Sequence, residues 1–225
     1  MSRAKHYNKK KSNIPSIILM CFFTALLIYS GTKIVIWYMN NQNNKKISDE
    51  IAEFVTVDET KEDDEEKYVV DFEKLKEKNS DIVAWLKVKG TNIETTVVKS
   101  TNNDYYLTHN FNKEYNSAGW IFADYKNKVD GTDKNIVIYG HNMRDDSMFG
   151  SLKNILNSDW YDNEENTNIT LYTENEKCIY KVFSIYKIES EDYYITTEFE
   201  NDNILTLSTC ANNNKYRVVL HAKKI

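Results

Sequence analysis

The sequence predicts a mainly β protein, an eight-stranded β-barrel with N-terminal and peripheral helices, preceded by one transmembrane helix. One observation behind this prediction is an apolar stretch over residues 14–39. A second is the series of short segments, from Tyr68 onward, that are rich in strand-forming residues and separated by turn residues. Helical spacing of apolar residues occurs only at residues 72–83 and 147–156, which favours a closed barrel over alternating βα units.

The composition narrows the class of protein. The chain has 225 residues, enough for a large hydrophobic core, and a formal net charge of -5, which argues against nucleic-acid binding. Its three cysteines are Cys21, Cys178 and Cys210. An odd number argues against a disulfide framework, although a single bridge between Cys178 and Cys210 remains open.

The N-terminal part combines a basic tail over residues 1–13 with the apolar stretch over residues 14–39. A helix rises about 1.5 Å per residue, so this stretch exceeds the roughly 30 Å hydrocarbon core of a bilayer. The positive-inside rule puts the basic tail in the cytosol and the rest of the chain outside the cell membrane. A cleaved secretory signal is the alternative, but the stretch is long for one and lacks an A-x-A cleavage site. We therefore expect a single-pass signal anchor.

Residues 40–67 are expected to form an extracellular tether. Its first part, "NNQNNKK", is polar and predicted to be structureless, and its last part, "DETKEDDEEK", concentrates like charge. Between them, the apolar residues of "ISDEIAEFVTV" can share one side of a short amphipathic helix. On this interpretation the folded domain covers residues 68–225.

Eight strands are expected within that domain. They are assigned to residues 84–88, 93–98, 118–123, 135–139, 167–172, 178–188, 204–209 and 216–222. The chain contains one proline, so asparagine and glycine are expected to make the turns.

The segment "ILTLSTC" ends in a thiol at a turn and is followed by "YRVVLHA". Side chains alternate along a strand, so a hairpin that pairs Leu207 with Leu220 also pairs Cys210 with Arg217 on one face. A free thiol needs a nearby cation or base to become a good nucleophile. The predicted register gives Cys210 a guanidinium as its neighbour.

Four histidines are candidates for the base. His6 lies in the basic tail, His109 has an ordinary polar loop context, and His221 sits inside the last strand, where a packed, hydrogen-bonded role is expected. His141 differs because "NIVIYGHNM" leads a buried strand directly into Gly140 and then the histidine. Loops at strand ends carry function, and a glycine permits close approach.

The segments around these residues resemble a known family. "NIVIYGHNMRDDSMFGSLKNIL", together with "ILTLSTC" and "YRVVLHAKKI", resembles the histidine, cysteine and arginine segments of the sortases, cysteine transpeptidases of Gram-positive bacterial surfaces. "NNDYYLTHNFNKEYNSAGWIFADYKN" is similar to class B in particular. The resemblance covers residues 68–225 and implies a sortase-type β-barrel.

The resemblance also implies catalytic roles. Cys210 would attack the threonine carbonyl of a sorting signal and form a thioacyl-enzyme. His141 would protonate the departing amine and later accept a proton from the incoming amine. Arg217 would hold the substrate or stabilise the oxyanion. This chemistry requires no metal or other cofactor, and the sequence has no His/Cys cluster at zinc spacing.

Matching to the family's motifs further implies a peptide groove lined by Asn103, Leu107, Tyr194, Ile195 and Ser208. A plain core role remains open for Leu107 and Ile195. One departure from class B is the short segment "ESEDYYITTEFENDN" before the cysteine strand, where class B sortases carry a long helical insertion. This departure leaves open whether the chain prefers an NPxTN-like pentapeptide.

The sequence therefore predicts a membrane-anchored transpeptidase that joins secreted proteins to a peptidoglycan amine. The expected partners are proteins that carry a sorting signal, the peptidoglycan precursor or cross-bridge amine, and membrane lipid around the N-terminal helix, with no nucleic acid. Three alternatives remain: a sortase that polymerises pilins, a cysteine hydrolase of the same fold, and a non-catalytic wall-associated module.

Overall fold

The computed structural model describes residues 13–57, 68–189, 203–210 and 215–225. The chain divides into two compact units, Met1–Met39 and Asn40–Ile225. Helix α1 (Ile14–Ala52) begins in the first unit and ends in the second.

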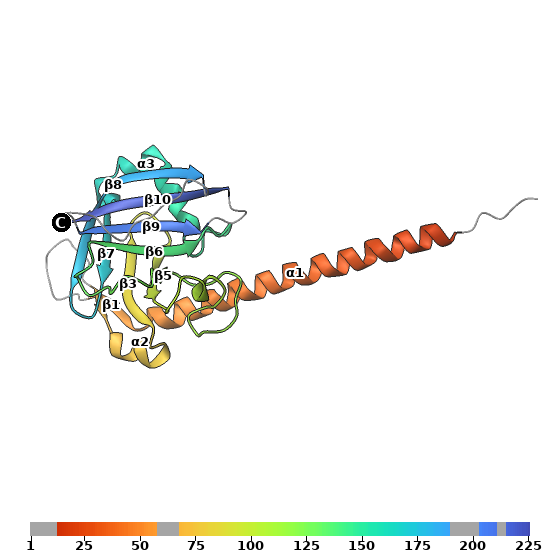
Figure 1. Ribbon diagram of the computed structural model, residues 1–225, viewed down its shortest axis with the longest axis horizontal. Coiled ribbons are helices and arrows are strands. Elements are labelled where there is room, and N and C mark those ends of the chain that lie inside the picture. Colours follow the sequence, from red (N-terminus) through yellow and green to blue (C-terminus); the bar gives the residue numbers. More distant parts are fainter. Residues whose placement is uncertain (1–12, 58–67, 190–202, 211–214) are drawn as a thin grey trace, which may run out of the picture. The chain divides into compact units, whose positions relative to one another are not determined.

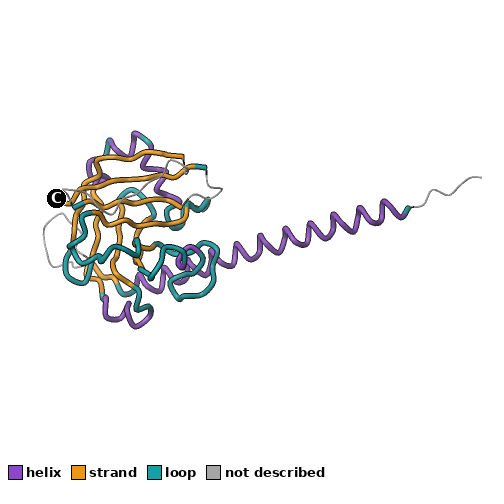
Figure 2. The backbone as a smooth tube through the Cα atoms, viewed as in Figure 1, coloured by secondary structure: helices purple, strands orange, loops and turns teal. Residues whose placement is uncertain are grey.

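The second unit is built on a closed barrel of eight strands (Figures 1 and 2). In barrel order the strands are β10 (Tyr216–Lys224), β8 (Lys177–Glu189), β7 (Asn168–Tyr172), β3 (Ile82–Val88), β4 (Ile93–Val98), β5 (Phe122–Ala123), β6 (Asn135–His141) and β9 (Ile204–Cys210). Neighbouring strands are antiparallel except for β4 with β5 and β6 with β9. The predicted fold class is thus confirmed, and each expected strand overlaps an observed one.

Short helices connect and flank the strands. They are α2 (Phe72–Lys78), η1 (Tyr105–Leu107), η2 (Gly150–Leu156), α3 (Ser158–Tyr161) and η3 (Glu164–Thr167), and the three η elements are 3-10 helices. Helix α2 is capped at its N-terminus by Asp71, whose carboxylate accepts a bond from the Lys74 N–H at 3.0 Å. It ends before Ile82, which the helical pattern had included and which instead opens β3.

The strand expected at residues 118–123 is reduced to the two residues of β5. The residues before β5 belong to a turn, because the Gly119 N–H bonds to the Asn116 carbonyl and the Trp120 N–H bonds to the Tyr106 carbonyl, both at 2.9 Å. Gly119 has φ +58, a conformation that only glycine adopts without strain.

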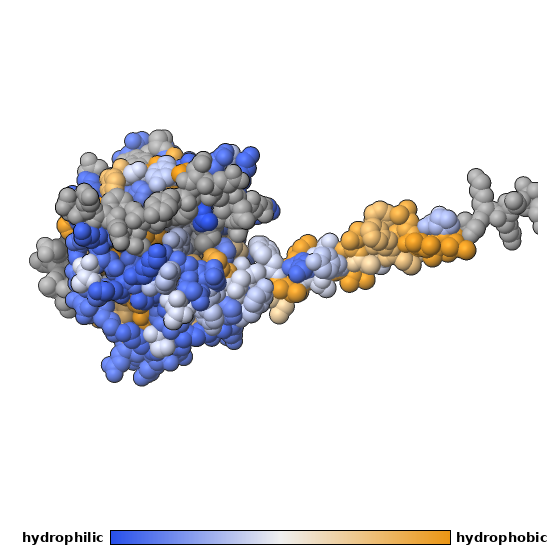
Figure 3. Space-filling model, in the orientation of Figure 1, coloured by the Kyte–Doolittle hydropathy of each residue, from blue (hydrophilic) through white to orange (hydrophobic). Residues whose placement is uncertain are grey.

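In the first unit, residues 14–39 of α1 carry large apolar side chains that are exposed (Figure 3). Within the described residues, α1 is the one helix that is long and apolar enough to cross a membrane. The length and composition of this helix agree with the expected transmembrane span.

Residues 40–57 differ from the expected tether, because they pack into the second unit. Ile47 and Ile51 lie one helical turn apart and are each 3% exposed. After α1, strand β1 (Val55–Val57) pairs with β2 (Tyr68–Val70). The segment "NNQNNKK" is therefore helical rather than structureless, and residues 58–67, the rest of the expected tether, lie outside the described residues.

The buried side chains form two clusters on opposite faces of the barrel wall. Leu86, Leu207 and Phe149 belong to the cluster inside the barrel. Ile47, Trp85 and Trp120 belong to the second cluster, which the end of α1, α2 and the residues after η1 help to form. Because consecutive residues of a strand face opposite sides, Trp85 and Leu86 are buried on different faces. The end of α1 is thus part of the folded core.

Candidate active site

Two of the three predicted catalytic positions meet at one edge of the barrel. Strands β6 and β9 are parallel neighbours, and their register pairs His141 directly with Cys210. Figure 1 shows β6, β9 and β10 side by side. Parallel strands end at the same edge of a sheet, so both residues stand where their strands end.

Arg217 stands at the start of β10, the other neighbour of β9. The observed register pairs Leu207 with Leu220 and Ser208 with Val219, as predicted, and it ends there. The Arg217 guanidinium donates from Nη1 to the Thr209 carbonyl at 3.2 Å. The guanidinium is thereby tied to the residue before Cys210, while the pairing of Cys210 with Arg217 stays a prediction.

The His141 ring is held by a backbone carbonyl. Its Nε2 lies 2.8 Å from the Leu107 carbonyl oxygen, which can only accept, so Nε2 carries the hydrogen. The other ring nitrogen, Nδ1, is buried and has no hydrogen-bond partner among the groups that the structure describes. In the neutral ring this atom has a free lone pair, and Nδ1 is therefore the atom available for proton transfer.

The turn after His141 is anchored on Gly140 and Phe149. A Cβ at Gly140 would lie 2.7 Å from the Phe149 ring, so only glycine lets this ring pack against β6. The His141 carbonyl accepts bonds from the N–H groups of Met143 and Phe149, at 3.1 and 2.9 Å. The predicted close approach at Gly140 is thus confirmed, and it fixes the backbone that carries the histidine.

The family model for the sortase domain matches residues 86–225. The chain belongs to the sortase family. It is 32% identical to "Sortase B" of Listeria monocytogenes over 89% of this chain and 93% of that protein. It is also 31% identical to "Sortase B" of Staphylococcus aureus, over 82% of this chain and 74% of that protein.

Solved structures agree with this family. A crystal structure of sortase B from B. anthracis in complex with AAEK1 superposes with a TM-score of 0.71 at 31% identity, covering 84% of this chain and 99% of that one. Sortase B of Clostridium perfringens gives a TM-score of 0.63 at 38% identity, covering 68% and 99%. This protein is a cysteine transpeptidase of the sortase family and most resembles class B.

The residues predicted to line the peptide groove of this sortase have different surroundings. The Asn103 amide donates to Asp124 at 2.8 Å and accepts from the Tyr125 N–H at 2.9 Å. Leu107 is half-buried and Ser208 is fully buried. Tyr194 and Ile195 lie outside the described residues, as does most of the short segment before the cysteine strand. The roles of these residues in substrate binding stay predictions.

Two backbone contacts of the site were not visible in the sequence. Leu107 was predicted for its side chain, whereas its carbonyl oxygen holds His141. Likewise, the Thr209 carbonyl accepts from Arg217, and the Thr209 hydroxyl accepts from the Val218 N–H at 2.9 Å. Carbonyl groups occur at every residue, so side-chain patterns carry no signal for them.

His221 has the packed role that was expected. Its Nδ1 lies 2.9 Å from the Thr206 hydroxyl and its Nε2 lies 3.0 Å from the Tyr186 hydroxyl. The Thr206 hydroxyl donates to Asn135, so it accepts from His221, and Tyr186 then donates to Nε2. This pattern requires a neutral ring, and burial lowers the pKa of His221 below its ordinary value.

We expect this histidine to make stability depend on pH. Because its pKa is lower in the folded protein, the unfolded chain binds more protons as the pH falls below about 6.5. The free energy of unfolding should therefore fall as the pH drops through that value. Urea denaturation at pH 7.5 and pH 5.5 should show a smaller difference in midpoint for His221→Gln than for the wild type, and an equal difference would contradict the prediction.

Cys178 is a free thiol buried in the barrel core. The Cys178–Cys210 bridge that the sequence left open is therefore ruled out. Burial raises the pKa of the Cys178 thiol, which keeps it protonated and poorly reactive.

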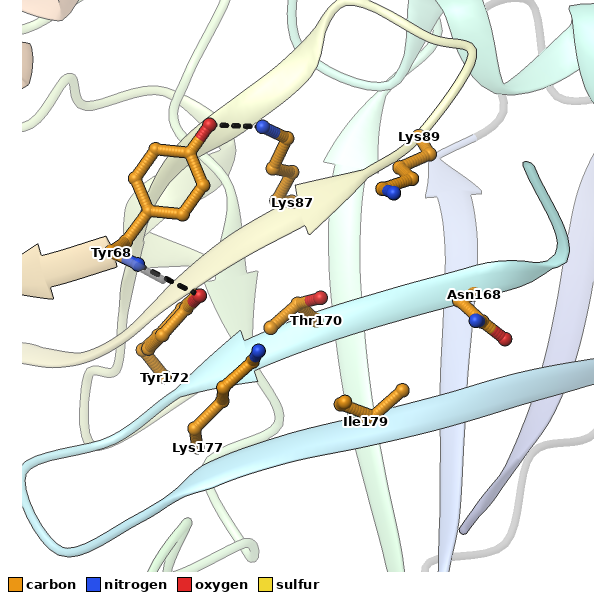
Figure 4. A pocket seen from close by; sticks show the side chains of 8 residues that line it. All are labelled: Tyr68, Lys87, Lys89, Asn168, Thr170, Tyr172, Lys177 and Ile179. Atoms are coloured by element: carbon orange, nitrogen blue, oxygen red, sulfur yellow. Dashed lines mark hydrogen bonds between the residues drawn. The ribbon is translucent and has the colours of Figure 1, made fainter. Parts of the chain in front are cut away.

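Two hollows lie elsewhere on the second unit. Figure 4 shows one beside β3, β7 and β8, where Lys87, Lys89 and Lys177 surround Thr170 and where Lys87 donates to the Tyr68 hydroxyl. A larger hollow, of about 260 Å³, is lined by residues of α1, by β4 and by residues of the turn after His141. Neither His141 nor Arg217 is among the described residues that line these two hollows.

Proposed function

We propose that this sortase cleaves a C-terminal sorting signal of secreted proteins after threonine and joins the threonine to an amine of peptidoglycan. The observation that supports this most strongly is the register that pairs His141 with Cys210. A thiol that is to form an acyl intermediate needs a base or a cation beside it, and the chain matches the sortase family model over residues 86–225.

In the proposed first step, His141 takes the proton of the Cys210 thiol, and the resulting thiolate attacks the threonine carbonyl carbon. The peptide bond after threonine then breaks, and His141 gives a proton to the departing amine. In the second step the acceptor amine attacks the thioester carbonyl, His141 takes a proton from it, and Cys210 leaves as the thiolate. Nδ1 of His141 is buried and lacks a partner among the described side chains, which supports its assignment as the atom that moves the proton.

Arg217 is assigned to the oxygen that becomes negative when the threonine carbonyl is attacked. Its bond to the carbonyl of Thr209, the residue before Cys210, keeps the guanidinium at the end of β9 and supports this assignment. A fixed donor to such an oxygen is worth about 2.7 to 4 kcal/mol. The permanent charge of the guanidinium also favours the thiolate.

We further propose that residues 14–39 anchor this sortase in the cell membrane in a single pass, with residues 1–13 in the cytosol and the barrel outside. The support is the length and the exposed apolar side chains of this part of α1, together with the basic residues before it. Sorting signals and peptidoglycan precursors would then reach the enzyme at the outer membrane surface.

The full-length protein in detergent micelles, incubated with a sorting-signal peptide library and an amine, tests the proposed function. The library holds threonine constant and varies its neighbours, and NPxTN peptides are one arm. Peptides that exchange their C-terminal part for the amine support the proposal. Cleavage without exchange indicates a hydrolase, and the absence of any Cys210-dependent product indicates a non-catalytic module. Competition between a lysine side-chain amine and a peptidoglycan-like amine tests the alternative of pilin polymerisation.

Replacing Arg217 with glutamine should lower kcat/KM about 10²-fold, because one fixed donor to the oxyanion is lost. Arg217→Lys should recover little, since an ammonium does not reproduce the planar guanidinium. Arg144, which is exposed in the turn after His141, provides the control for loss of an arginine. Steady-state peptide cleavage measures all three variants, and equal losses for Arg144→Gln and Arg217→Gln would contradict the assignment.

A further inference from the structure

The end of α1 is tied by asparagine side chains to the residues that hold His141. Asn44 is 3% exposed, and both ends of its amide are used. Its Nδ2 donates to the Gly119 carbonyl at 3.1 Å, and its Oδ1 accepts from Asn116 Nδ2 at 2.8 Å. Asn116 also donates to the Asn40 carbonyl at 3.0 Å. Buried amides with all these bonds hold their partners in one arrangement.

The residues that Asn44 holds form a turn over positions 116–119. The Asn116 side-chain oxygen accepts from the Ala118 N–H at 2.9 Å, and the Asn116 N–H bonds to the Thr108 carbonyl at 2.8 Å. Asn44 therefore closes this turn from outside.

The 116–119 turn lies against the Leu107 carbonyl, which holds the His141 ring. A Cβ built on Gly119 would lie 2.8 Å from the Leu107 carbonyl oxygen and 2.4 Å from that of Tyr106. The Leu107 oxygen is the one that accepts from His141 Nε2. A shift of Gly119 would therefore displace the Leu107 carbonyl, and the imidazole would lose the contact that sets its orientation.

We propose that Asn44 is a positioning residue for His141, acting through the 116–119 turn and the Leu107 carbonyl. The segment that leads out of the apolar span is then part of the active-site framework. This inference rests on the proposed role of His141. In chemical terms, the amide of Asn44 would keep Nδ1 of His141 oriented toward the reacting atoms.

The test compares Asn44→Ala with Ile47→Ala in the full-length protein in detergent micelles. Ile47 is on the same helix and is equally buried, at 3% exposure, but it contributes through apolar packing. With the library peptide that turns over fastest, Asn44→Ala should lower kcat about tenfold and leave KM within about twofold, because a small misplacement of a catalytic group slows chemistry. Ile47→Ala should lower the urea midpoint at least as much and keep kcat within about twofold.

A double-mutant cycle keeps the proposal testable if one variant folds poorly. Asn116→Ala breaks the same turn, so its effect should not add to that of Asn44→Ala. The double variant should lose about tenfold in kcat, whereas two independent tenfold effects would give about a hundredfold loss. Asn43→Ala is the matched surface control, because its amide reaches Glu114 only at 3.4 Å and is exposed.

A second readout does not depend on the peptide. The pH dependence of Cys210 alkylation by iodoacetamide should shift in Asn44→Ala and not in Ile47→Ala, since a misplaced His141 no longer supports the thiolate. An unchanged kcat and alkylation profile in Asn44→Ala, or equal changes in Ile47→Ala, would overturn the inference. An active His141→Gln variant would overturn the proposed function as well. An inactive His141→Gln variant together with an unaffected Asn44→Ala variant would overturn only the inference about Asn44.

Discussion

Cys210→Ala is expected to lose at least about 10⁴-fold of the peptide cleavage activity, because it removes the thiol that is proposed to form the acyl intermediate. Mass spectrometry of the protein with the library peptide should detect a thioester adduct in the wild type and none in the variant. Alkylation provides an independent measurement, since iodoacetamide should modify Cys210 and spare the buried Cys178 of the folded protein.

Cys178→Ala is the matched control for this result. Its thiol packs in the barrel core, so its loss should lower the urea midpoint and leave the adduct in place. An adduct that persists in Cys210→Ala and disappears in Cys178→Ala would reverse the assignment of the nucleophile.

His141→Gln is expected to lower kcat about 10³-fold, within the range of losses seen when a general acid–base group is removed. Glutamine can still donate to the Leu107 carbonyl, so the turn should stay in place while proton transfer is lost.

His109→Gln is the control for this variant. His109 is also a loop histidine, its ring lies 4.2 Å from the Tyr105 ring, and its Nδ1 bonds to the Tyr105 carbonyl at 2.8 Å. The activity of the His109→Gln variant should remain within about twofold of the wild type. A His141→Gln variant within tenfold of the wild type, or a matching loss in His109→Gln, would contradict the assignment.

The barrel strands were predictable because alternation and turn residues are local properties. The hairpin of β9 and β10 followed the predicted register as far as Ser208 and Val219, since pairing Leu207 with Leu220 keeps both leucines in the core. The length of strand β5 was overestimated because residues before it are buried without belonging to a strand: Trp120 packs in the second cluster and Ile121 in the cluster inside the barrel.

The role of residues 40–57 was not predictable in the same way. The asparagines within residues 40–44 are typical of a polar spacer. Their hydrogen-bond partners, such as Asn116 and Gly119, are distant in sequence. The same limit applies to the parallel pairing of β6 with β9, which side-chain periodicity does not specify. The segment over residues 14–39 remains a proposed membrane span. The folded unit was expected to start at Tyr68, whereas the observed compact unit starts at Asn40.

The order of the strands also sets when the enzyme can become active. Strand β9 closes the ring between β6 and β10, so His141 and Cys210 meet only after one of the last two strands has been made and inserted. Contacts between segments so far apart along a chain form late and slowly during folding. A chain still being synthesised therefore has His141 without Cys210 beside it, and the proposed acyl transfer can begin only once β9 lies between β6 and β10.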